Sequence, residues 1–64
     1  MDTGYKDADG TIIKVGNKLY NPFFEDYWIV VIINNEYMAK LISSKYEHYE
    51  SLEAVCDTFR VCEE

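Results

Sequence analysis

A run of seven strand-favouring residues, Tyr27–Ile33, restricts the fold of this 64-residue chain more than any other feature. Aromatic and β-branched side chains fit the pleated, half-buried surface of a sheet. Asn34 and Asn35 follow the run, and asparagine tolerates the left-handed backbone of a two-residue type I′ hairpin turn. A second run, Glu36–Ile42, comes next. The sequence therefore predicts a β-hairpin over residues 27–42.

The two-residue turn also predicts the register of this hairpin, because turn length fixes which residues face each other. Ile33 then pairs with Glu36, and Trp28 pairs with Leu41. Side chains alternate between the two faces of a strand, so the hairpin can be sorted into two sets. The set without any charge is the predicted core face, with Trp28, Val30, Ile32, Tyr37, Ala39 and Leu41.

The opposite face of the hairpin is also largely apolar. A sheet face that met only water would carry polar side chains instead. It holds Tyr27, Ile29, Val31, Ile33, Met38 and Ile42, and only Glu36 and Lys40 interrupt it. Two explanations stay open. In the first, Ile12, Ile13, Leu52, Val55 and Phe59 of the same chain pack on this face. In the second, a partner or a second copy covers it, and self-association then uses Ile29, Val31, Ile33 and Met38.

The rest of the chain predicts short elements separated by turns. Asp9-Gly10 and Gly16-Asn17 are typical of turns, since glycine accepts a positive φ. The predicted elements are strands at 11–15, 18–20, 46–50 and 58–62 and a helix of about two turns at 51–57, with Ser51 as its N-cap. We expect one mainly β domain over residues 1–64 with one short helix, in which residues 1–10 are a candidate flexible segment.

Charge and hydropathy exclude some function classes. Twelve Asp and Glu against six Lys and Arg give a net charge of −6, whereas a nucleic-acid surface needs clustered cations. No apolar run approaches the ~18 residues of a membrane span. The N-terminus lacks the basic start and apolar stretch of a signal peptide. We therefore expect a cytoplasmic protein that contacts neither nucleic acid nor membrane directly.

The sequence offers little catalytic chemistry. It has no glycine-rich phosphate loop and no nucleophile beside a base and an orienting group. His48 is the only histidine, and Cys56 and Cys62 do not form a Cys-x-x-Cys pair, so we expect no metal and no cofactor. The acidic pairs at 25–26 and 63–64 are neighbours that point apart on a strand. A non-enzyme is expected, and a metal protein or enzyme centred on His48 and the cysteines is the least favoured hypothesis.

Aromatic and acidic residues gather in two segments, one directly after Pro22 and one before Ser51. Loops often carry function, and aromatic residues are favoured anchors at interfaces. An acidic, aromatic surface would attract a basic partner protein. The candidate contact residues are Phe23, Phe24, Glu25, Asp26, Tyr46, Glu47, Tyr49 and Glu50. The alternative is that the acids only confer solubility and that Phe23 or Phe24 fills the end of a barrel.

The segment Ile13-Lys14-Val15-Gly16-Asn17-Lys18-Leu19-Tyr20 resembles the opening of many SH3-like small barrels, whose first strand often reads apolar–x–apolar–Gly–Asp–x–apolar. The resemblance covers these eight residues in motif and most of the chain in outline. It implies a small antiparallel barrel or a strongly bent sheet. The basic loops and extra glycine of the nucleic-acid-binding members are missing, and no catalytic residue carries over.

Short acidic proteins with such openings also resemble accessory proteins of bacteriophages and mobile elements. That likeness implies a phage or mobile-element inhibitor of a basic, nucleic-acid-binding host enzyme, in other words an anti-defence protein. The competing hypothesis is a small structural protein that forms homo-oligomers through the apolar hairpin face.

Overall fold

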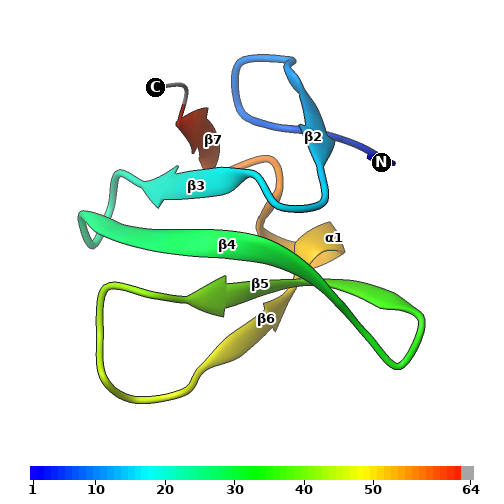
Figure 1. The fold of residues 1–64 in the computed structure, drawn as a ribbon. Helices are drawn as coiled ribbons and strands as arrows, with labels where there is room; N and C mark the ends of the chain where they lie inside the picture. Colours follow the sequence, from blue (N-terminus) through cyan, green and yellow to red (C-terminus); the bar gives the residue numbers. More distant parts are fainter. Residues whose placement is uncertain (63–64) are drawn as a thin grey trace.

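The computed structural model describes residues 1–62, so the acidic pair at 63–64 lies outside the described residues. Figure 1 shows the elements in chain order. They are β1 (Asp2–Lys6), β2 (Ile12–Lys14), β3 (Lys18–Asn21), β4 (Asp26–Ile33), β5 (Glu36–Leu41), β6 (Tyr49–Ser51), α1 (Leu52–Val55) and β7 (Arg60–Cys62). The predicted fold class, mainly β with one short helix, is confirmed.

Five strands form one antiparallel sheet in the order β6-β5-β4-β3-β7, and β1 and β2 form a separate hairpin beyond β3 (Figure 1). Within the described residues, β6 and β7 remain the two edges of this sheet and do not pair with each other. The sheet is therefore open and does not close into a barrel.

The predicted hairpin is confirmed, and so is its register. Trp28 pairs with Leu41 and Ile33 with Glu36. Asn34 and Asn35 have φ values of 52° and 66°, as a type I′ turn requires. The local sequence signal was sufficient here because the turn and both strands lie within sixteen consecutive residues, 27–42.

The core lies on the predicted face of the hairpin. It combines Trp28, Val30 and Ala39 of the hairpin with Ile13, Leu19, Leu52 and Phe59 from other segments. Ile32 differs from the prediction and is 45% exposed. The pairing of β3 with β4 stops at Lys18 and Ile29, so the tip of the hairpin extends beyond β3, and Ile32 has no residue of β3 opposite it.

The opposite side of the sheet, which we call the outer face, holds Tyr27, Ile29, Val31, Ile33, Met38 and Ile42. Ile13, Leu52 and Phe59 do not cover it, because they pack with Trp28 in the core. Val55 also packs partly against that core, and Ile12 is 37% exposed. The explanation in which these residues of the same chain bury the outer face is therefore wrong.

Residues 1–10, the candidate flexible segment, contain β1, which pairs with β2. The predicted helix is shorter than expected and spans only Leu52–Val55. Ser51 occupies its N-cap position but makes no side-chain capping hydrogen bond. The predicted edge strand at 46–50 lies slightly later, as β6, and it does form an edge of the sheet.

Candidate binding pocket

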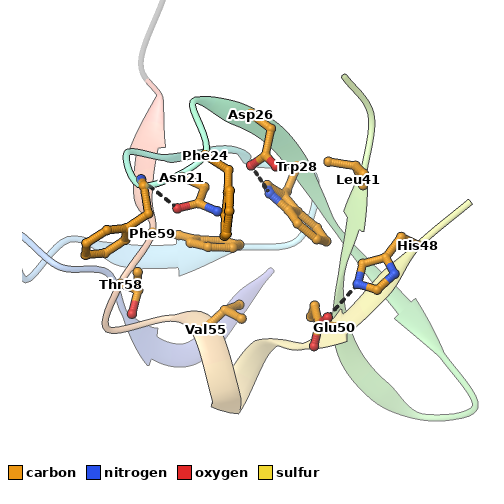
Figure 2. Close-up of a pocket in the computed structure, with 11 residues that line it drawn as sticks. Asn21, Phe24, Asp26, Trp28, Leu41, His48, Glu50, Val55, Thr58 and Phe59 are labelled. Carbon is orange, nitrogen blue, oxygen red and sulfur yellow. Dashed lines mark hydrogen bonds and ion pairs between the residues drawn. The ribbon is translucent and has the colours of Figure 1, made fainter. Parts of the chain in front are cut away.

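A cavity of about 440 Å³ opens on the core side of the sheet, between the β3–β4 loop, β6 and α1. Figure 2 shows its lining side chains directed around one common space. Residues from distant parts of the chain contribute to it. The lining residues are Asn21, Phe23, Phe24, Asp26, Trp28, Leu41, His48, Glu50, Val55, Thr58 and Phe59.

The β3–β4 loop forms one rim of the pocket. Asn21 is buried, and its side-chain Oδ1 accepts a hydrogen bond from the backbone N–H of Phe23 at 3.0 Å. Glu25 has a positive φ of 55° and turns the chain back into β4. This loop leaves Phe23 77% exposed and Phe24 81% exposed. Neither ring fills the core, so both phenylalanines are available for contact with another molecule.

Trp28 forms the centre of the pocket wall. Its indole Nε1–H donates to Asp26 Oδ1 at 2.7 Å, which satisfies the polar atom of an otherwise buried ring. The ring also lies 5.3 Å from Phe59 and meets His48 edge-on at 5.7 Å between centroids. Figure 2 shows Trp28 between Asp26 and His48. These contacts fix the orientation of both the ring and the Asp26 carboxylate.

Glu50 brings a second carboxylate to the pocket from β6. Its Oε2 lies 2.5 Å from His48 Nε2, and both side chains are partly exposed. Asp26 and Glu50 therefore each use one carboxylate oxygen for a neighbour within the pocket. Within residues 1–62, the second oxygen of each carboxylate has no hydrogen-bond donor. Two oriented acceptors are thus presented from two different strands.

The pocket combines aromatic faces with negative charge. Phe24 supplies an exposed ring, Trp28 and Phe59 supply buried rings that are 5% and 4% exposed, and Asp26 and Glu50 supply carboxylates. No Lys or Arg is present among the described residues that line it. A cation is attracted both by the negative face of an aromatic ring and by a carboxylate. The chemistry of the pocket therefore suits a cationic ligand group.

The contact residues predicted from the sequence lie in two separate regions of the structure. Phe23, Phe24, Asp26 and Glu50 line the pocket, and Glu25 lies at the tip of the adjacent loop. Tyr46 and Glu47 lie in the exposed connection between β5 and β6. Tyr49 pairs with Lys40 and so lies on the side of the outer face. The predicted surface is therefore two separate regions, of which one borders a cavity.

Sequence reasoning assigned Trp28, Leu41 and Phe59 to packing and missed that they also line the pocket. A signal was present in the spacing of Asp26 to Trp28, because residues two apart on a strand share a face. The same spacing separates Glu50 from His48, which directly precedes β6. Each pair places an acid beside a ring. The remaining lining residues come from segments whose approach depends on the whole fold.

Other chemistry has little support among residues 1–62. No group of three or more His, Cys, Asp or Glu is placed to hold a metal ion, and no helix there has the length and hydropathy to cross a membrane. Burial raises the pKa of the Cys56 thiol, with a further contribution from Asp57, so this cysteine is a weak nucleophile at neutral pH. Comparisons with protein-family models, curated proteins and solved structures find no match to this chain.

Proposed function

We propose that this protein is a non-catalytic binding module that captures a basic segment of a partner protein at the Trp28 pocket. The observation that carries the proposal is the pairing of exposed aromatic rings with two oriented carboxylates around one cavity. The proposal keeps the basic partner expected from the sequence. It moves the contact surface toward the pocket and away from Tyr46, Glu47 and Tyr49.

The expected energies are sufficient for specific but moderate binding. A cation over an aromatic ring contributes about 0.5–2 kcal/mol, and a hydrogen bond to a charged group contributes about 1.5–3 kcal/mol. Phe23 and Phe24 can add apolar contact beside the pocket, since both are exposed. The net charge of −6 further attracts a basic partner at long range.

Tryptophan fluorescence provides a direct test, because Trp28 is the only tryptophan in the chain. The probes are two unstructured peptides of equal length, one rich in Lys and Arg and the other rich in Glu. We expect the basic peptide, and not the acidic peptide, to change the fluorescence emission of Trp28. Its Kd should rise when salt increases from about 0.05 M to about 0.5 M, since salt screens charge pairs. A salt-independent Kd, or no binding of the basic peptide, would contradict the proposal.

A pair of variants locates the binding surface. Phe24→Ala removes an 81% exposed ring from the pocket rim and should weaken binding without unfolding the protein. Tyr46→Ala removes a 72% exposed ring outside the pocket and is the matched control. Equal effects of the two substitutions would contradict a site at the pocket.

The narrower inhibitor hypothesis concerns the identity of the partner. It is supported by the acidic composition of the chain and by the resemblance to accessory proteins described above. It predicts that a basic nucleic-acid-binding enzyme is captured from nuclease-treated bacterial lysate and that added DNA displaces it. Capture of a partner that DNA does not displace would contradict the inhibitor hypothesis but not the binding module.

Self-association through Ile29, Val31, Ile33 and Met38 is the second candidate function. The observation that favours it is that the core residues pack on the other side of the sheet, so these four side chains stay only half-buried. Apolar patches on small proteins commonly mark contacts. The pocket and the outer face lie on opposite sides, so the two functions are compatible.

A further inference from the structure

We infer that the cation recognised by the pocket is the guanidinium group of an arginine side chain. This inference rests on the proposed function and specifies the ligand of the same site. The starting observation is that Asp26 and Glu50 each have one oxygen engaged inside the pocket and one oxygen without a donor among residues 1–62.

The number of acceptors favours arginine. A guanidinium has five N–H donors in a rigid planar fork, so it can donate to two separated carboxylates at once. An ammonium is a compact, strongly hydrated charge with three donors, and it loses more hydration when it enters a cavity. Asp26 on β4 and Glu50 on β6 provide two separate acceptors, and a branched group with five donors can serve more acceptors than a point charge with three.

The aromatic lining supports the same ligand. A planar guanidinium stacks on aromatic faces, whereas an ammonium only approaches them as a charge. Trp28 is fixed by Asp26, His48 and Phe59, so its ring is already oriented before a ligand enters. Phe24 reaches the same cavity from the β3–β4 loop and lines it together with Trp28 (Figure 2). Phe24 therefore offers the exposed ring for stacking, while Trp28, which is only 5% exposed, forms the wall of the cavity.

A methylated lysine could pack on the exposed Phe24 ring but could not satisfy the carboxylates. A trimethylammonium group has no N–H donor, so the second oxygens of Asp26 and Glu50 would lose water without gaining a hydrogen bond. Uncompensated burial of a charged acceptor is unfavourable. The presence of oriented carboxylates therefore distinguishes this pocket from a purely aromatic cage.

The test uses four short capped peptides that differ only at one central residue: arginine, lysine, trimethyl-lysine or citrulline. Trp28 fluorescence and amide chemical shifts report binding to the full chain at peptide concentrations up to the millimolar range. We expect arginine to bind tightest. The Kd for citrulline, which has the same shape but no charge, should be higher by about tenfold, equivalent to about 1.4 kcal/mol.

Two pairs of isosteric variants assign the preference to the pocket. Asp26→Asn removes the negative charge but keeps an oxygen that can accept the Trp28 Nε1–H. Its control, Asp57→Asn, removes a negative charge from an exposed residue outside the pocket. Glu50→Gln and its exposed control Glu47→Gln form the second pair. We expect the preference for arginine over citrulline to shrink in Asp26→Asn and Glu50→Gln and to persist in both controls.

The outcomes separate this inference from the proposed function. Salt-sensitive binding in which lysine equals arginine would overturn the arginine assignment and leave the basic binding module intact. Tightest binding of trimethyl-lysine would also overturn it. If none of the peptides changes the emission or the chemical shifts of the pocket residues, both the inference and the proposed function are wrong.

Discussion

Asp7 is a buried carboxylate that joins two distant parts of the chain. Its Oδ1 accepts the backbone N–H groups of Asp9 and Thr11, and its Oδ2 accepts that of Val61, 54 residues away in sequence. Burial raises the pKa of Asp7, but hydrogen bonds from Val61, Thr11 and other backbone N–H groups outweigh it and hold the pKa below its ordinary value of 3.8. The charged form is therefore favoured by folding.

This arrangement predicts a pH-dependent contribution to stability. Asp7→Asn should lower the free energy of unfolding at neutral pH by about 1–3 kcal/mol, because charged acceptors of backbone N–H groups are lost. A carboxylate whose pKa is lower in the folded state than in the unfolded state stabilises the fold at pH values above its unfolded-state pKa. This stabilisation is lost as the pH falls through its folded-state pKa. Urea unfolding at several pH values should therefore show the deficit shrinking below about pH 4. Asp9→Asn is the exposed control, and a deficit that does not change with pH would contradict the prediction.

At the scale of the element, the β4–β5 turn sets the geometry of the central hairpin. Both central asparagines have positive φ, which costs other non-glycine residues about 1–2 kcal/mol. We expect Asn35→Ala to lower the free energy of unfolding by about 1 kcal/mol, whereas Asn35→Gly should retain or increase it. Urea unfolding of the two variants checks this. Equal destabilisation by alanine and glycine would show that the asparagine side chain, and not its backbone conformation, stabilises the turn.

The elements that could be predicted are those whose signals are local. The hairpin turn, its register and the buried positions of Trp28 and Val30 follow from alternation over consecutive residues. Ile32 was misassigned because its exposure depends on where β3 begins, at Lys18 opposite Ile29, which the β4 sequence does not contain. The strand β1 was missed because its five residues, Asp2–Lys6, are mostly polar and alternate weakly.

The candidate site was only partly predictable for a related reason. The acidic and aromatic residues of the β3–β4 loop are visible as a cluster in the sequence, and they do line the pocket. The other wall depends on Glu50 and Phe59 approaching Trp28, which requires the β5–β6 connection and α1 to fold back over the sheet. Tyr49 was assigned to the same surface as Glu50, although adjacent strand residues point to opposite faces.

At the scale of the whole molecule, the two sides of the sheet offer different surfaces. The core side carries the acidic pocket, and the outer face carries apolar side chains bordered by Lys18 and Lys40. Lys18 is held by a cation–π contact with Tyr27, with its Nζ 4.5 Å from the ring centroid. A two-fold dimer through the outer face would therefore leave both pockets accessible.

Self-association can be tested at this scale. We expect Val31→Glu to convert a dimer into a monomer, because it places a charge at the centre of the outer face, opposite Met38. Ile32→Glu is the matched control, since Ile32 is the adjacent residue, points to the other side and is already 45% exposed. Sedimentation equilibrium measures the mass of each protein. A wild type that is already monomeric at high concentration, or a Val31→Glu variant of unchanged mass, would contradict self-association.

The central position of β4 has a consequence for aggregation. Its segment Tyr27–Ile33 has high β-propensity, no charge, no proline and no glycine, which is the composition of amyloid-forming peptides. In the folded sheet this strand lies between β3 and β5. The edges are instead the three-residue strands β6 and β7, which carry Glu50 and Arg60 and are poor templates for further strands. Exposure of this segment therefore requires unfolding, and we expect any fibril formation to follow the rate of unfolding.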